Sequence, residues 1–432
     1  MTLPFNPPER ADWFIRDRFG MFIHWGLYAL GARHEWLMNF EEIDPSTYYK
    51  YFQHYDPDLY NPREWAETAR RAGMRYAVIT AKHHEGFCNW DSQLTDYKVT
   101  NTPYGKDVLQ EWVTAFREAG LKIGFYYSLI DWHHPDFTID SMHALRNHPD
   151  ALEMNKIRDM NRYRAYLHGQ VRELLTGFGK IDLIWFDFSY PERAWHDGTP
   201  GKDHNDWDSE NLLKMVRELQ PEILVNNRLD LPLGAADFYT PEQYQPESWP
   251  TIQGQRVMWE LCQTFSGSWG YYRDEQTWKS PDQLIKMLIN TVACGGNLLM
   301  NVGPTARGTF DKRATAALEV YHEWLRLHGR AIYNCTQSDF TPPPGCRYTQ
   351  NGKRLYLHIF SWPFQEINLP GLAGKVEYAQ FLNDASEILL AAPHHITLVG
   401  EEAPEVEAGT LTLTLPVQKP DVQVPVIELY LK

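Results

Sequence analysis

Residues that can act as acids, bases, nucleophiles or hydroxyl ligands follow a series of apolar segments in the first three quarters of the chain. Asp187 stands near the end of the apolar run 181–188 (IDLIWFDF), where strand alternation places Trp185 on the same face. A helix N-cap, a structural ion pair and a catalytic role all remain open for this carboxylate. The other candidates, each near the end of its own segment, are His24, Glu35, His83, His84, Tyr126, Tyr127, Arg228, Glu242 and Glu260.

Two acids beside aromatic rings, together with histidines that can bond hydroxyl groups, favour glycoside hydrolysis. One carboxylate attacks or orients the nucleophile, and the other protonates the leaving oxygen. A zinc-dependent barrel hydrolase that uses His24, His83 and His84, with Asp187 as a further ligand, is the competing interpretation. Against zinc, the first segment offers no His-x-His pair, and adjacent histidines within a strand point to opposite faces.

The segments that position these residues alternate with amphipathic helices, as in βα units around a parallel sheet. Helical spacing of apolar residues is clearest over 106–119 and 281–294. The sequence therefore predicts an α/β fold, a (β/α)8-like TIM barrel, whose functional groups gather at the C-terminal ends of the strands. The predicted strands are 19–25, 76–83, 121–128, 181–188, 223–228, 236–241, 257–263 and 297–302.

The pattern changes near residue 337, where the helical periodicity stops. A proline-rich break at 342–345 is followed by short alternating segments, including 354–360 and 411–415. We expect a catalytic barrel over 1–336 and a C-terminal antiparallel β-sandwich over 337–432.

Composition restricts the partners. A formal net charge of −15 disfavours nucleic acid and anionic membranes, which both attract clustered lysine and arginine. The 5 cysteines include no Cys-x-x-Cys pair, and an odd count is not a disulfide framework. No signal-peptide pattern or run of 18 apolar residues occurs, so we expect a cytoplasmic protein. We expect no metal or organic cofactor, and whether the chain forms a homo-oligomer is left open.

Several motifs between Arg18 and Tyr333 resemble, in order, those of the α-L-fucosidases of glycoside hydrolase family 29. They are RFGMFIHWG, HEW, AKHHEGF, GFYYSLIDWHH, IWFDF, NNR, DFYTPEQ, SWGY and GGNLLMNVGP. The resemblance implies a retaining exo-glycosidase that removes terminal α-L-fucosyl residues from oligosaccharides or glycoconjugates by double displacement. It implies Asp187 as the nucleophile and Glu242 as the acid/base, with Glu260 second and Glu247 third for that role.

The same resemblance implies a set of sugar-binding residues. They are His24, Glu35, His83, His84, Trp185, Arg228, one of Tyr126 and Tyr127, and Glu260 if Glu242 is the acid/base. We expect Arg228 to keep Asp187 ionised, and an apolar surrounding near Tyr239 and Tyr244 to raise the pKa of Glu242. Trp25, Trp259 and Trp269 are candidates for the apolar surface that meets the fucose methyl group. A non-catalytic fucose-binding protein is the remaining alternative, and the presence of both acids argues against it.

Overall fold

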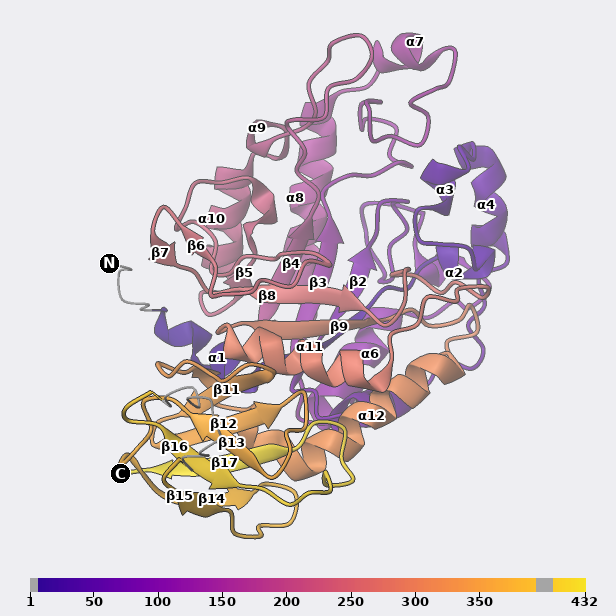
Figure 1. Cartoon of the computed structure of the whole chain (residues 1–432). Helices are drawn as coiled ribbons and strands as arrows, with labels where there is room; N and C mark the ends of the chain where they lie inside the picture. Colours follow the sequence, from indigo (N-terminus) through magenta and orange to yellow (C-terminus); the bar gives the residue numbers. More distant parts are fainter. Residues whose placement is uncertain (1–6, 394–406) are drawn as a thin grey trace.

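The computed structural model describes residues 7–393 and 407–432 (Figure 1). Its larger part is built around one parallel sheet in the order β5-β4-β3-β2-β1-β9-β8. The strands are buried along their lengths, which explains their near-continuous apolar sequences. They are β1 (Phe19–Ile23), β2 (Tyr76–Lys82), β3 (Lys122–Ser128), β4 (Leu183–Asp187), β5 (Leu224–Val225), β8 (Glu260–Thr264) and β9 (Asn297–Val302).

The predicted sixth strand, 236–241, is not a strand. The segment lies between the edge strands β5 and β8 and touches them through single parallel bridges, Asn226 to Phe238, Tyr239 to Trp259 and Glu242 to Cys262. Pro241 has no N–H to donate to a ladder, and the Asp237 carboxylate accepts the Val225 N–H at 2.8 Å, a backbone donor of the neighbouring strand. The barrel therefore has seven strands, and an irregular segment closes the gap.

Helices cover the outside of this sheet (Figure 1). The two helices predicted most clearly from spacing are confirmed, and Ser280 and Gln283 form the capping box at the start of the second. The covering helices are α5 (Pro62–Arg71), α6 (Val108–Glu118), α8 (Met160–Gly177), α10 (Ser209–Leu219), α11 (Pro281–Ala293) and α12 (Lys312–His328). Shorter helices are α1 (Asp12–Asp17), α2 (Tyr28–Gly31), α3 (Leu37–Phe40), α4 (Pro45–Gln53), α7 (Ala151–Asn155) and α9 (His204–Trp207).

The C-terminal part is the predicted antiparallel sandwich, with its own apolar core between two sheets. One sheet contains β10 (Thr336–Gln337), β11 (Cys346–Asn351), β12 (Arg354–Ile359), β17 (Val426–Leu431) and β14 (Val376–Phe381). The other contains β13 (Glu366–Leu369), β16 (Leu411–Thr414) and β15 (Leu389–Ala391). The predicted limit between residues 336 and 337 falls inside β10. A separate two-stranded hairpin, β6 (Thr251–Ile252) and β7 (Gln255–Arg256), precedes β8.

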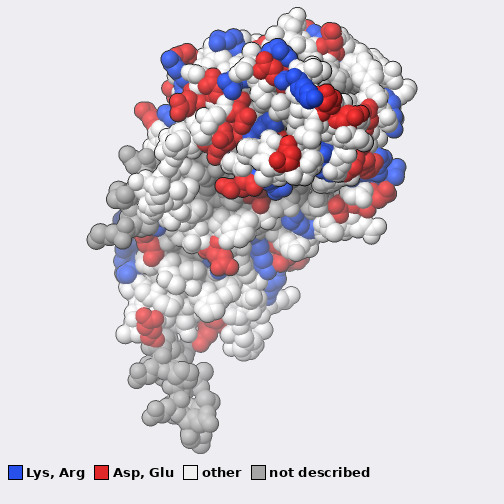
Figure 2. Space-filling model, turned by 90° about the horizontal axis from the view of Figure 1, so that it is seen from above, with Lys and Arg blue, Asp and Glu red and all other residues white. Residues whose placement is uncertain are grey.

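The surface shows no single-sign field on the face seen from above, where acidic and basic side chains intermingle (Figure 2). Among the described residues, no helix combines the length and apolarity needed to cross a bilayer.

Candidate active site

A cavity of about 550 Å³ opens where β1, β2, β3 and β4 end. This is the end of a parallel barrel at which side chains from successive strands converge. Most of the predicted site residues line it: His24, Glu35, His83, His84, Tyr126, Trp185, Asp187 and Glu242.

Asp187, the last residue of β4, lies in this cavity with a partner on each carboxylate oxygen. The Tyr126 hydroxyl donates to Oδ2 at 2.7 Å, and Arg228 donates to Oδ1 at 3.1 Å. Burial raises the pKa of Asp187 to about 6, although Arg228 acts to lower it. The predicted influence of Arg228 is present, but burial outweighs it. Asp187 remains ionised at neutral pH.

Glu242 is bonded to the same Arg228 guanidinium as Asp187. Arg228 donates to Glu242 Oε2 at 3.0 Å, and its own position is fixed by the Thr240 hydroxyl at 3.0 Å. The Arg228 guanidinium also lies over the Trp185 ring, 4.9 Å from its centroid. The expected apolar surrounding of Glu242 is wrong, because its side chain is 43% exposed and Tyr244 is 66% exposed. One arginine thus joins the two acids at the cavity.

His24 is neutral and presents a lone pair to the cavity. Burial lowers its pKa to about 3, so the ring carries one proton. Its Nδ1 lies 2.7 Å from Asn301 Oδ1, whose amide is oriented because Asn301 Nδ2 donates to the Trp269 carbonyl at 2.6 Å. The proton therefore sits on Nδ1, and Nε2 is left as an acceptor.

His84 is also neutral, because burial lowers its pKa as well. Its Nδ1 donates to Ser128 Oγ at 2.7 Å, because the Ser128 hydroxyl itself donates to the Ile130 carbonyl at 2.7 Å. Nε2 of His84 is then an acceptor that lies 3.8 Å from Asp187 Oδ2. His83, whose pKa burial lowers as well, keeps a buried Nδ1 without a partner among the described residues.

Glu35 is buried and half satisfied. Its Oε2 accepts from the backbone N–H groups of Trp269 at 3.2 Å and Gly270 at 2.8 Å. Its Oε1 has no hydrogen-bond partner among the described residues, although His34 Nδ1 is 3.3 Å away. Buried polar atoms are normally satisfied, so Glu35 Oε1 and His83 Nδ1 are the two exceptions among the described residues that line this cavity.

Two predicted substrate contacts are wrong. Tyr127 points out of the barrel, where its hydroxyl donates to Gln170 Oε1 on α8 at 2.8 Å. Glu260 is sealed in the barrel interior beneath Trp185, whose indole N–H donates to it at 3.2 Å, and it also bonds the Tyr76 hydroxyl. Neither residue lines the cavity, and neither does the exposed Glu247.

Of the three tryptophans proposed for the methyl group, the structure brings only Trp269 to the cavity. Trp25 and Trp259 are buried elsewhere and bond the carbonyls of Thr305 and Cys294. Sequence reasoning missed Trp36 and Phe188, which pack against the His84 ring at centroid distances of 4.9 and 5.2 Å. Trp36 directly follows Glu35. Phe188 directly follows Asp187, and its φ of 85° turns it out of the alternation of β4.

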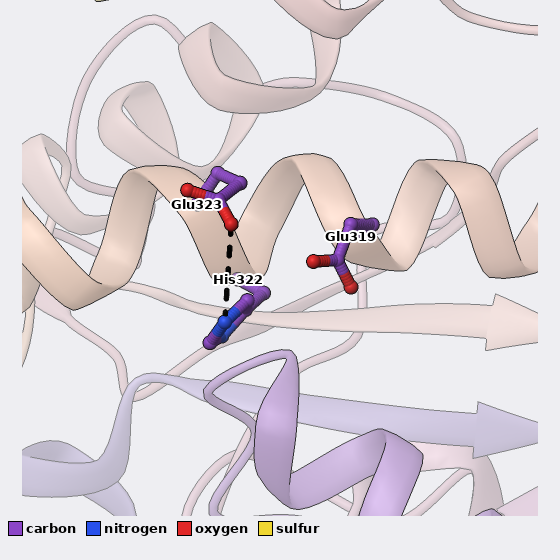
Figure 3. A group of neighbouring side chains, drawn as sticks. All are labelled: Glu319, His322 and Glu323. Carbon is purple, nitrogen blue, oxygen red and sulfur yellow. Dashed lines mark ion pairs between the residues drawn. The ribbon is translucent and has the colours of Figure 1, made fainter.

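The zinc interpretation gains no support at the cavity. Among the described residues, the only compact group of possible ligands is Glu319, His322 and Glu323 on α12 (Figure 3). Two of these groups already have protein partners. The Arg71 guanidinium pairs with Glu319, and the Arg71 backbone carbonyl is hydrogen-bonded to His322 Nδ1 at 2.8 Å. His24, His83 and His84 do not bring their ligand atoms together in this way.

The chain is similar to known α-L-fucosidases along most of its length. The family model for α-L-fucosidase matches residues 6–330. The solved structure of α-L-fucosidase isoenzyme 1 from Paenibacillus thiaminolyticus is 42% identical, with a TM-score of 0.90 over 98% of this chain and 99% of that one. The human plasma α-L-fucosidase is 29% identical over 390 residues, 81% of this chain and 76% of the relative.

A third similar protein has been captured during reaction. The family 29 α-L-fucosidase of Bacteroides thetaiotaomicron was trapped as a covalent intermediate with 2-fluoro-fucosyl fluoride. It is 26% identical, with a TM-score of 0.83 over 100% of this chain and 98% of that one. Because the family model matches most of the chain and the solved structure from Paenibacillus thiaminolyticus shares its fold at 42% identity, the chain belongs to the α-L-fucosidase family, glycoside hydrolase family 29.

Proposed function

We propose that this protein hydrolyses terminal α-L-fucosyl residues of oligosaccharides or glycoconjugates with retention, using Asp187 as nucleophile and Glu242 as acid/base. Family membership supports the substrate class, and the trapped intermediate of the Bacteroides relative supports the double displacement. The observation that carries the residue assignment is the Arg228 guanidinium, which binds both carboxylates at the cavity.

Asp187 is suited to attack the anomeric carbon. It is ionised at neutral pH, and its two hydrogen bonds aim the carboxylate while leaving a lone pair on each oxygen. In forming the glycosyl-enzyme ester, Asp187 gives up its negative charge, and Glu242, having lost its proton, becomes the anionic partner of Arg228.

Glu242 acts at the open side of the cavity, where its half-exposed carboxyl can reach a leaving group. It delivers a proton to the departing oxygen in the first step. As a carboxylate it then stays paired with Arg228 and takes a proton from the water that hydrolyses the ester. Arg228 stabilises this second state because Asp187 is neutral at that stage.

The sugar would be held by acceptors that match its hydroxyl groups. Nε2 of His24, Nε2 of His84 and Oε1 of Glu35 each offer a lone pair that no described protein donor fills. Phe22 and Trp269 line the same cavity and offer apolar surface to the methyl group. The predictions that the protein is cytoplasmic, needs no cofactor and binds neither nucleic acid nor membranes stay predictions.

The nucleophile is tested with para-nitrophenyl α-L-fucoside and azide. Asp187→Ala should lose at least about 10³-fold in kcat, since the covalent step disappears. Azide that enters the vacated space should attack from the nucleophile's face and give β-L-fucosyl azide. Near wild-type activity of Asp187→Ala would overturn the assignment.

The acid/base is tested by comparing leaving groups. Glu242→Ala should lose about 10²- to 10⁴-fold with a sugar leaving group, far more than with para-nitrophenol. Azide should then give α-L-fucosyl azide, because it intercepts the glycosyl-enzyme. Glu247→Ala is the matched control, since Glu247 is exposed outside the cavity. If Glu260→Ala showed this pattern instead, the acid/base would be Glu260.

A further inference from the structure

We propose that the outer part of the cavity is an aglycone subsite for leaving groups that carry an anionic substituent. Phe40 and Trp36 form its stacking surface, and Arg193 supplies its cation. This inference rests on the proposed function, since it names the aglycone that the same cavity would accept.

The outer wall is built from three segments that bond to one another. They are α3, the loop 129–150 after β3, and the loop 188–203 after β4. Asn39 of α3 donates to the Met142 carbonyl at 2.9 Å, and the Ser141 hydroxyl donates to the Arg193 carbonyl at 2.7 Å. All four of these residues line the cavity that contains Asp187.

A buried cluster fixes the two long loops against each other. The Tyr190 hydroxyl donates to Asp140 Oδ2 at 2.7 Å, and the buried Lys202 ammonium pairs with the same carboxylate. The Lys202 carbonyl accepts the Tyr190 N–H at 2.9 Å, and the Tyr190 carbonyl accepts the Arg193 N–H at 3.1 Å. The backbone of Arg193 is thus held on both sides.

The Arg193 guanidinium, in contrast, has almost no protein partner. Its one hydrogen-bond contact among the described residues is Met142 Sδ at 3.8 Å, and no carboxylate of the described residues lies within ion-pair distance. The other arginines at this site are engaged, Arg146 with Glu42 at 3.4 Å and Arg228 with both catalytic candidates. An unpaired cation at the cavity is notable in a chain with 56 acidic and 41 basic residues.

Phe40 and Trp36 give this part of the cavity an aromatic surface. Their rings are stacked, with centroids 5.7 Å apart and planes 28° from parallel. Phe40 is 62% exposed, so its ring is accessible to a ligand that enters the cavity. A flat ring bound on this surface would leave the cavity floor to the fucosyl group.

The chemistry of Arg193 points to an oxyanion on that ring. A guanidinium binds a carboxylate or a sulfate through two parallel N–H donors and keeps its charge at any physiological pH. Acidic sugars and sulfated sugars share this chemistry, so the test includes one carboxylate and one sulfonate, which stands in for a sulfate ester.

The test compares fucosides that differ in one substituent: para-carboxyphenyl, para-sulfophenyl and the neutral para-carbamoylphenyl α-L-fucoside. For each variant, kcat/KM of each anionic substrate is divided by that of the neutral one. Arg193→Gln should lower this ratio about five- to tenfold, the range of a partly exposed charge-assisted bond. Differences between the phenols as leaving groups cancel when the ratio is compared across variants.

Three further measurements test the subsite. Arg326→Gln on the outer side of α12, where Arg326 pairs with Glu323, should leave the ratio at the wild-type value. Added salt should lower the ratio in the wild type and hardly move it in Arg193→Gln, because screening acts on the lost charge. Phe40→Ala should raise KM several-fold for all three aryl fucosides, unlike Phe364→Ala, which changes an exposed ring of the sandwich.

A ratio unchanged by Arg193→Gln for both anions would overturn the subsite while the enzyme still hydrolyses all three fucosides. A loss confined to one anion would support the subsite and assign it to that anion. If the wild type hydrolysed none of the fucosides, the proposed function itself would fail.

Discussion

Two carboxyl groups near Trp185 show how this barrel separates a sealed acid from one that faces the cavity. Glu260 is bonded only by neutral donors, the Trp185 indole and the Tyr76 hydroxyl. Asp187 is paired with the Arg228 cation and faces the cavity. Burial raises the pKa of both, to about 8 for Glu260 and about 6 for Asp187.

The two environments act differently on the same functional group. A sealed site with neutral partners keeps a carboxyl protonated at neutral pH, where it can only hold structure. A nearby cation lowers the pKa of a buried carboxyl toward its ordinary value, and the opening leaves its lone pairs accessible. Burial alone therefore does not mark the nucleophile.

The largest effects should appear in stability as a function of pH, for Glu260→Gln and Asp187→Asn. Each carboxyl has a higher pKa folded than unfolded, so each destabilises the fold as pH rises from the unfolded value to the folded one. Relative to the wild type, the free energy of unfolding of Asp187→Asn should increase by about 3 kcal/mol between about pH 4 and pH 6 and then stay level. For Glu260→Gln the increase should continue to about pH 8 and reach about 5 kcal/mol.

Thermal midpoints of both variants and the wild type, followed from acid to alkaline pH, measure this contrast. The constant offset of each variant includes its altered hydrogen bonds, but the change with pH does not. If the stability differences of the two variants levelled off at the same pH, Arg228 would not be the cause of different pKa values for Asp187 and Glu260.

A second prediction removes the cation itself. In the wild type, kcat/KM should fall below about pH 6 as Asp187 becomes protonated. Arg228→Met should move this fall to higher pH, because Arg228 lowers the pKa of Asp187, and should cost about 10- to 100-fold at pH 6. Arg228→Lys keeps the charge and should hold the profile near its wild-type position. A fall that stayed in place in Arg228→Met would remove Arg228 from the control of Asp187.

The sequence predicted the barrel well because buried parallel strands are nearly continuous apolar runs. Seven of the eight predicted strands are present. The failure at 236–241 has a local cause: Asp237 uses its carboxylate on a backbone N–H of β5, and Pro241 lacks a donor. Composition made this segment look like a strand, and only its partners show that it is not one.

A site residue could be predicted where the alternation of a single strand decides the direction of its side chain. It could not be predicted where that direction depends on how the strand is placed in the sheet. Glu260 and Glu242 both stand near strand-like segments, but β8 turns Glu260 into the sealed interior. No sequence pattern indicated Arg193. Its proposed role depends on two loops that are separate in the sequence and meet through Asp140, Tyr190 and Lys202.

The smallest predicted effect uses two neighbouring tyrosines on opposite faces of β3. Tyr126→Phe removes the hydroxyl that donates to Asp187 at 2.7 Å, which also helps to lower the pKa of Asp187. Loss of a hydrogen bond to a charged group should lower kcat/KM about tenfold at pH 6 and move the acid fall upward. Tyr127→Phe is its matched control, because that hydroxyl bonds Gln170 outside the barrel. It should leave the pH profile in place and reduce the stability by about 1 kcal/mol. If the two variants shifted the pH profile equally, the hydrogen bond from Tyr126 to Asp187 would not be the cause of the shift.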